Sequence, residues 1–142
     1  MKSVRLSFTK KGRARFISHL DMNRTLTRLV RKSGLDIWYT EGFNPHPYYA
    51  FALALSLGFE SNCEILDFNI TEDMPLNEVK DRLNAVMPEG MRIISVTEQK
   101  LKVTAIAKAE YTFTLLTDEP EMLKQQITAL LEQNEILVEK KT

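Results

Sequence analysis

The pattern of apolar positions divides the first two-thirds of the chain into strands and helices. Residues 4–9 alternate apolar and polar side chains, which is the period of a strand with one buried face. Over residues 18–32 the apolar positions recur at helical spacing, which predicts an amphipathic helix with Ser18 as N-cap and Gly34 as its stop. The same spacing predicts a second helix over residues 75–87, because a proline fits its first turn.

Three other segments are typical of strands, namely residues 36–40, 64–71 and 91–97. The apolar run over residues 50–57 is expected to be buried, but its periodicity does not decide between helix and strand. The resulting order is strand, helix, two or three strands, helix, strand. This order predicts an α+β fold built on a ferredoxin-like split βαβ sheet with its helices on one face.

The last third of the chain repeats part of this pattern. After a connector, residues 111–116 predict a strand, 120–133 a helix and 136–139 a further strand. This half is similar to the opening of a second βαβ unit, and the chain stops before such a unit would close. We therefore predict a ferredoxin-like domain over residues 1–98 and a partial, C-terminally truncated βαβ half over 99–142, unless the last strand joins the first sheet.

Composition excludes several classes of protein. The 142 residues are 44% hydrophobic and 27% charged, which is ordinary for a globular protein that is not in a membrane. The single cysteine, Cys63, excludes internal disulfides and cysteine-held zinc or iron–sulfur sites, which favours the cytoplasm. Neither a signal peptide nor a membrane-spanning run is expected, and no motif predicts a bound metal or cofactor.

The net charge of zero conceals an uneven distribution. Residues 1–48 contain ten Lys and Arg against three Asp and Glu, whereas residues 49–142 contain nine against sixteen. Such an asymmetry indicates an anionic partner for the basic segment. The alternative is that the two oppositely charged parts complement each other within the fold.

Two neighbouring motifs supply the candidate binding residues. The first is a set of arginines whose planar forks suit phosphate groups, namely Arg13, Arg15, Arg24, Arg28 and Arg31. The second is the loop of residues 41–49, which Pro45 and Pro47 stiffen and which offers aromatic faces. Stacking faces beside basic groups suit single-stranded RNA, although these aromatics could instead form the core of a small sheet.

Both histidines lie in these motifs. His19 projects close to the centre of the apolar helix face, so it is either a structural histidine or a general base. The stiff loop carries His46. We expect this loop to be ordered without ligand and to lie beside the start of the first helix, with His46 near His19 or Arg15.

The motifs resemble those of the radical-SAM-linked protein family, a bacterial domain of unknown function. The segments that carry the resemblance are Arg13-x-Arg-Phe-Ile-Ser-His-Leu-Asp21, Arg24, Arg31-Lys-Ser-Gly34, Glu41-Gly-Phe-Asn-Pro-His-Pro47, Leu55-Ser-Leu-Gly58 and Glu64-x-x-Asp67. The resemblance implies a radical SAM protein as partner, fused or encoded nearby, often with a ribonuclease of the E/G type in the neighbourhood. Because one cysteine cannot supply the three-cysteine motif of a radical SAM enzyme, the resemblance favours a non-catalytic accessory role for this chain.

Three functional hypotheses follow. The first is an accessory domain that binds RNA, such as tRNA, and presents it for modification by a radical SAM partner. Its five arginines would hold phosphates, and the loop side chains Phe43, Asn44, His46 and Tyr48 would contact bases. The second is a metal-independent, ferredoxin-like endoribonuclease with His19 as general base, to which Phe16-x-Ser-His-Leu-Asp21 is faintly similar, although the glycine-rich loop of those enzymes is missing. The third is a protein–protein adaptor whose basic face meets an acidic partner.

Overall fold

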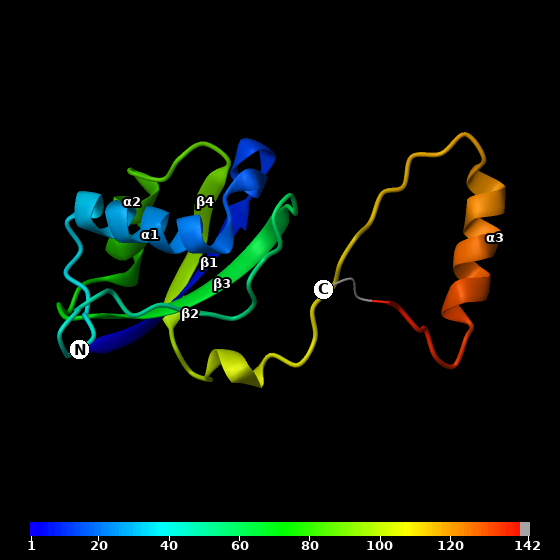
Figure 1. The fold of residues 1–142 in the computed structure, drawn as a ribbon. Coiled ribbons are helices and arrows are strands. Elements are labelled where there is room, and N and C mark those ends of the chain that lie inside the picture. The colour runs from blue at the N-terminus through cyan, green and yellow to red at the C-terminus, as the bar shows by residue number, and fades with distance from the viewer. Residues whose placement is uncertain (140–142) are drawn as a thin grey trace. The chain divides into compact units, whose positions relative to one another are not determined.

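The computed structural model describes residues 1–139, and its first two-thirds follow the predicted order of strands and helices (Figure 1). The elements are β1 (Lys2–Lys10), the 3-10 helix η1 (Gly12–Phe16), α1 (His19–Ser33), β2 (Ala50–Phe51), β3 (Ser61–Ile70), α2 (Leu76–Asn84), β4 (Met91–Glu98), the 3-10 helix η2 (Val103–Ala105) and α3 (Pro120–Leu131). None of the helices among these described residues is long and apolar enough to cross a membrane.

The four strands form one antiparallel sheet in the order β2-β3-β1-β4. β1 lies at its centre, where Leu6 pairs with Leu66 of β3 on one side and with Val96 of β4 on the other. Because β3 separates β1 from β2, the connectivity is that of the split βαβ pattern. The predicted α+β fold is confirmed.

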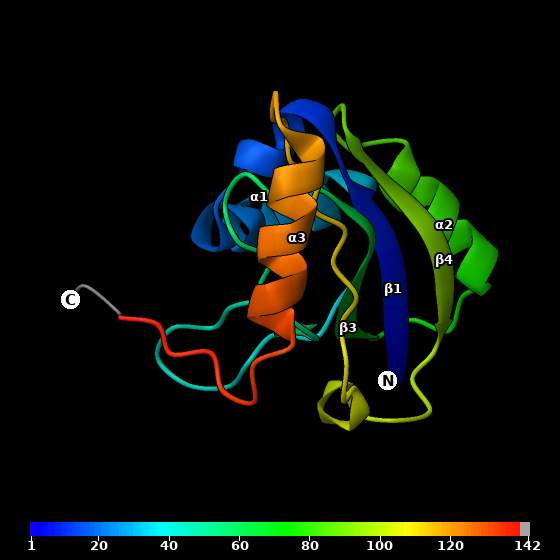
Figure 2. The same ribbon diagram turned by 90° about the vertical axis from the view of Figure 1, so that its right-hand side faces the viewer.

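Both helices of the first unit lie over one face of this sheet (Figures 1 and 2). The alternation in β1 places Val4, Leu6 and Phe8 toward the helices, and all three are almost completely buried. They pack in one core with apolar side chains of α1 and α2, among them Leu26 and Leu83. This continuous core fixes the two helices against the sheet and therefore fixes which face of α1 is exposed.

Local signals set the ends of α1 as predicted. The Ser18 hydroxyl accepts a hydrogen bond from the Asp21 backbone N–H at 3.1 Å, which satisfies one of the free donors of the first turn. Gly34 ends the helix in the left-handed conformation with φ of 69°. α2 is shorter than predicted. Its last residue, Asn84, accepts a hydrogen bond from the Ile93 N–H and donates one to the Ile93 carbonyl, which ties this end of the helix to β4.

Two predictions about the segments between α1 and β3 are corrected. Residues 36–40 form no strand, since they contribute only isolated bridges from Ile37 to Ile70 and from Tyr39 to Pro47. The apolar run over 50–57 pairs with β3 only at Ala50–Phe51, and Leu53 and Leu57 beyond it are exposed. An apolar run without a period carries no information about how far pairing extends.

The chain divides into two compact units, Met1–Lys108 and the segment from Ala109 onward. In the second unit helix α3 is confirmed, with Pro120 at its first turn. The strands predicted at 111–116 and 136–139 are absent from the described structure, so these predictions are wrong. A strand needs a neighbour for its backbone hydrogen bonds, and no described segment pairs with either stretch.

Candidate nucleic-acid interface

The outer face of α1 carries a stripe of exposed arginines, Arg24, Arg28 and Arg31. At 100° per residue, these three positions fall within an arc of about 60° around the helix axis. The buried side chains of α1, such as Leu26 and Leu29, point in the opposite direction toward the core. Packing of the apolar face therefore forces the arginine stripe toward solvent.

Two of the three charges in this stripe form no ion pair within residues 1–139. Arg24 forms an ion pair with Asp21, with 3.2 Å between Nη1 and Oδ1. Neither Arg28 nor Arg31 forms an ion pair with any residue of the described chain. Exposed guanidinium groups without an internal carboxylate are available to an external anion, and their planar forks match phosphate oxygens.

Two hydrogen bonds between Thr40 and His46 join the two ends of the loop that follows residue 39. The Thr40 N–H donates to the His46 carbonyl at 2.9 Å, and the His46 N–H donates to the Thr40 hydroxyl at 3.1 Å. Within this closure Gly42 has a φ of 118°, which side-chain-bearing residues rarely adopt. Phe43 is fully exposed, so the alternative that it belongs to a core is wrong.

Tyr49 connects this loop to α1. Its side chain is half-buried, and burial raises the pKa of the phenol to about 12, while Thr27 and the positive charge of Arg31 act in the opposite direction. The hydroxyl is buried without a hydrogen bond of acceptable geometry in the described chain. Thr27 uses its own proton on the Asn23 carbonyl at 2.9 Å. The end of the loop therefore lies close to Thr27 of α1.

The remaining aromatic residues of the loop region are divided between structure and surface. Tyr48 is exposed and meets the ring of Trp38 edge-on, with 6.0 Å between the ring centroids. Trp38 is half-buried, and its N–H backbone group donates to the Asn69 carbonyl of β3. The Trp38–Tyr48 pair thus supports the loop, while Tyr48 stays exposed to solvent.

Arg13 and Arg15 lie on η1, at the other end of α1. Arg15 faces Glu60 with 3.6 Å between Nη1 and Oε1, and its guanidinium covers the Phe16 ring at 4.8 Å. In Figure 1 the loop that follows α1 lies toward the far end of that helix. His46 contacts Thr40 and Asn44 within the loop, whereas His19 meets Phe51. The prediction that this loop lies beside the start of α1, with His46 near His19 or Arg15, is therefore wrong. The two motifs form separate surfaces.

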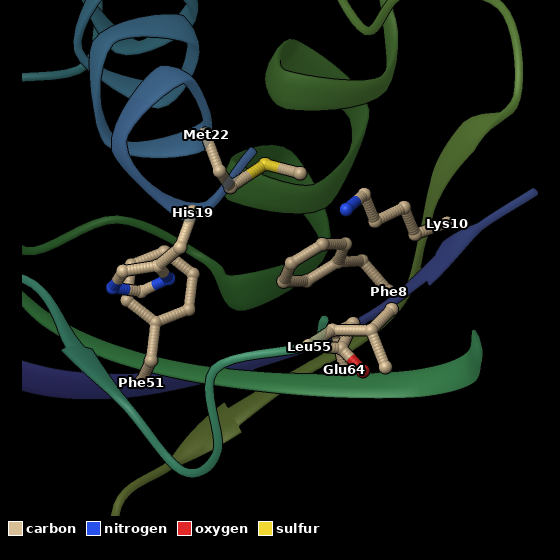
Figure 3. A pocket seen from close by; sticks show the side chains of 7 residues that line it. All are labelled: Phe8, Lys10, His19, Met22, Phe51, Leu55 and Glu64. Atoms are coloured by element: carbon tan, nitrogen blue, oxygen red, sulfur yellow. The ribbon is translucent and has the colours of Figure 1, made fainter. Parts of the chain in front are cut away.

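His19 borders a small pocket at the start of α1 (Figure 3). The pocket is lined by Phe8, Lys10, His19, Met22, Phe51, Leu55 and Glu64 and has room for about one water molecule. The His19 ring meets Phe51 edge-on with 4.9 Å between centroids, and its Nε2 lies 3.5 Å from the Asn23 amide nitrogen. The residue as a whole is exposed, so the apolar face of the helix does not enclose it.

Lys10 is the polar residue that the hydrophobic pattern missed. It occupies an inward position of β1 and is only 2% exposed. Its Nζ donates to the Ile17 carbonyl at 2.7 Å, which anchors the junction between η1 and α1. Desolvation lowers the pKa of this lysine, and the nearby Glu64 carboxylate partly opposes that effect. A signal was present, because Lys10 continues the inward alternation of Val4, Leu6 and Phe8.

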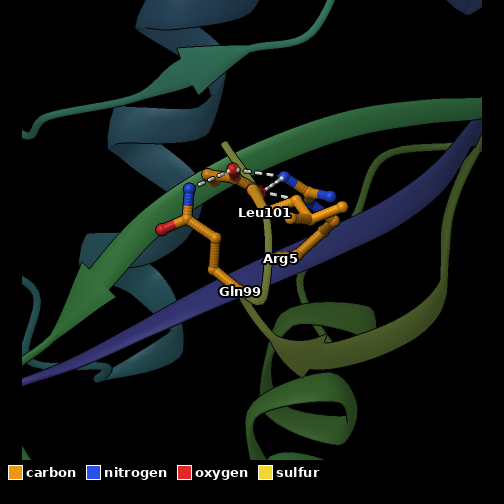
Figure 4. Close-up of polar contacts among 4 residues, drawn as sticks. Arg5, Gln99 and Leu101 are labelled. Carbon is orange, nitrogen blue, oxygen red and sulfur yellow. Dashed lines mark hydrogen bonds and ion pairs between the residues drawn. The ribbon is translucent and has the colours of Figure 1, made fainter. Parts of the chain in front are cut away.

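The opposite face of the sheet holds an arginine of a different kind (Figure 4). Arg5 donates to both oxygens of Asp67, from Nε at 2.7 Å and from Nη2 at 2.8 Å. Gln99 donates to the same carboxylate at 2.7 Å, and Arg5 also donates to the Leu101 carbonyl at 2.6 Å. The hydrogen bond to Asp67 raises the pKa of the Arg5 guanidinium. This network holds the connector after β4 against the sheet.

The fold and its surfaces define an α+β domain of the split βαβ class with an exposed basic helix. Residues 3–142 match the family described as "Uncharacterized protein conserved in bacteria (DUF2344)", and the chain belongs to this family. No curated protein matches the chain. Within residues 1–139 no three His, Cys, Asp or Glu side chains gather closely enough to hold a metal ion.

Proposed function

We propose that this protein binds single-stranded RNA on a surface formed by Arg24, Arg28 and Arg31 of α1 together with the loop over residues 40–48. The observation that carries the proposal is that the exposed arginines of α1, two of them without an ion-pair partner among residues 1–139, are followed in the chain by a loop that exposes Phe43 and Tyr48. Tyr49 ends this loop and lies near enough to α1 for the positive charge of Arg31 to act on the pKa of its phenol.

The two parts of this surface serve different parts of a nucleotide. Guanidinium groups bind phosphates and release counterions, so they supply affinity without reading the sequence. Phe43 and Tyr48 offer ring faces on which unpaired bases can stack. Asn44 and His46 lie between them in the chain and offer polar groups to base edges. Arg13 and Arg15, beyond the other end of α1, would extend the surface for a strand that follows the helix.

We further propose that the protein is a cytoplasmic accessory that presents RNA, such as tRNA, to a radical SAM partner for modification. The motif resemblance supports this partner. The sequence supports an accessory role, because one cysteine cannot hold the cluster of a radical SAM enzyme.

Binding of labelled tRNA and of an unstructured RNA oligomer across a salt series tests the proposal, with the products examined on a denaturing gel. The account predicts binding that weakens steeply with salt and leaves the RNA intact. Cleavage that disappears in His19→Ala would support the endoribonuclease hypothesis instead. Failure of both RNAs to bind at low salt would overturn the proposal and leave a protein adaptor as the remaining hypothesis.

A further inference from the structure

We propose that His46 selects the bound nucleotide, because its Nε2 atom accepts a hydrogen bond from an N–H group of an unpaired base that stacks on Phe43. This inference rests on the proposed function. It adds that the protein accepts the hydrogen bond and the base donates it. It assigns to one ring atom a role that the basic helix cannot fill, since arginine side chains only donate hydrogen bonds.

The surroundings of His46 determine which ring nitrogen carries the proton. Nδ1 lies 3.0 Å from the Asn44 carbonyl oxygen, which can only accept a hydrogen bond. An unprotonated Nδ1 at this distance would place two lone pairs against each other. Nδ1 therefore carries the proton and donates it to Asn44. The Thr40 hydroxyl, 3.1 Å from the same nitrogen, already accepts from the His46 N–H and can share the Nδ1 proton as a second acceptor.

A neutral imidazole has one proton on its two nitrogens, so a protonated Nδ1 leaves Nε2 as an acceptor. Among residues 1–139 no group forms a hydrogen bond with this Nε2. The residue is exposed, and the flanking Pro45 and Pro47 restrict the backbone that carries it. The acceptor is thus held in place before any ligand arrives, which reduces the entropy cost of binding.

The chemistry of an unpaired base fits this arrangement. The exposed Phe43 ring belongs to the same closed loop and provides a stacking face. A stacked base presents its Watson–Crick edge sideways, where N–H donors and carbonyl acceptors alternate. Nε2 would pair with an N–H of that edge, and uracil offers only one, at N3.

The first test needs no RNA. Nitrogen NMR of the imidazole ring at pH 8, where an ordinary histidine is neutral, reports which nitrogen of His46 carries the proton. The inference predicts a protonated Nδ1 and an unprotonated Nε2. A His46 ring that is protonated mainly at Nε2 would overturn the inference whatever the RNA-binding result.

The second test compares oligouridine with oligo-N3-methyluridine of equal length. The methyl group removes the uracil N–H and leaves charge and stacking face in place. One hydrogen bond predicts that the protein prefers oligouridine by about 3–10-fold. His46→Asn is the matched variant, because its amide can still donate to the Asn44 carbonyl but has no atom at the Nε2 position. This variant should bind both oligomers alike.

The outcomes separate the inference from the proposed function. Equal binding of both oligomers by the unaltered protein contradicts the role of His46 while the RNA-binding proposal stands. A preference that persists in His46→Asn also overturns the role. If neither oligomer binds, the proposed function is wrong, and the inference that His46 contacts a base falls with it.

Discussion

The sheet and the outer face of α1 both present arginines, and they differ in what surrounds the charge. Arg5 on the sheet donates two hydrogen bonds to Asp67 and one to the Leu101 carbonyl. Arg28 and Arg31 on α1 have no ion-pair partner in the described chain. An arginine whose donors are satisfied internally serves the fold, whereas one with free donors can serve a ligand.

The same contrast separates the two ends of α1. Near its start, Lys10 is held by the Ile17 carbonyl, and Arg15 faces Glu60. Toward its end, Arg31 forms no ion pair within the described chain, and the loop that follows α1 exposes Phe43. Residue type alone therefore does not identify a binding surface. The internal partners of each charged group do.

The largest effect on stability is expected at Asp67, whose carboxylate is hydrogen-bonded by Arg5 within the fold. Asp67 is 3% exposed, and Asp67→Ala would leave the Arg5 guanidinium unpaired inside the network. Because the pair is part-buried and Arg5 keeps its bond to the Leu101 carbonyl, the change should cost about 1.5–3 kcal/mol of unfolding free energy. Urea unfolding measures this loss, while RNA affinity per folded molecule should stay unchanged. The exposed pair of Lys2 with Glu98 is the control, and Glu98→Ala should cost far less.

Removal of the exposed arginine stripe of α1 should lower RNA affinity and leave stability nearly unchanged. The triple variant Arg24→Ala, Arg28→Ala, Arg31→Ala should reduce the slope of log affinity against log salt by about 2 units and weaken binding ~100-fold at 0.1 M salt. Its unfolding free energy should change little, because all three side chains are exposed. A control triple of equal charge is Arg92→Ala, Lys100→Ala, Lys102→Ala, also exposed. Equal losses of RNA affinity in both triple variants would show that only net charge matters. That result would contradict the assignment of the binding surface to α1.

The aromatic residues allow a smaller test of the same contrast. Phe43 and Phe16 are both exposed phenylalanines, one on the loop and one on η1 at the other end of α1. Phe43→Ala should weaken RNA binding by about 1–3 kcal/mol, the contribution of one stacked base. Phe16→Ala should weaken binding less, because the Phe16 ring lies under the Arg15 guanidinium and not on the loop. If Phe16→Ala has the larger effect on affinity, the binding surface lies at the start of α1 instead.

The smallest effect concerns Lys10 and is a dependence on pH. Desolvation lowers the pKa of Lys10 in the folded protein below its ordinary value of 10.5. As pH rises through the interval between the lowered value and 10.5, the unfolded state still holds a proton that the folded state has lost. The free energy of unfolding therefore increases as pH rises, which means that the folded protein becomes more stable. Relative to Lys10→Met, the unaltered protein should become more stable between pH 8 and pH 10.5 in urea unfolding. A constant difference would show that burial does not affect this ammonium.

Much of the fold could be predicted from the sequence because its main elements have clear periods. The alternation in β1 and the helical spacing in α1 each specify one buried face, and the caps Ser18 and Gly34 set the helix ends. The segments at 111–116 and 136–139 also have apolar patterns. A pattern does not supply the neighbouring strand, however, and neither segment forms one.

The candidate site could be predicted only in part. Helical spacing alone places the arginines on one face of α1. The position of the loop depends on a long-range contact, that of Tyr49 with Thr27, which no local pattern encodes. For the same reason the pattern missed the burial of Asp67, an outward-facing carboxylate that Arg5 and Gln99 enclose.

The central claim is that the arginine stripe and the loop form one RNA-binding surface, and NMR mapping of backbone amides during titration with an oligouridine tests it most directly. The account predicts shifts that concentrate in residues 24–31 and 40–48 and saturate together with one dissociation constant. Shifts confined to η1 and the pocket around His19 would contradict it. Saturation of the two segments at different RNA concentrations would also contradict it, because they would then belong to separate sites.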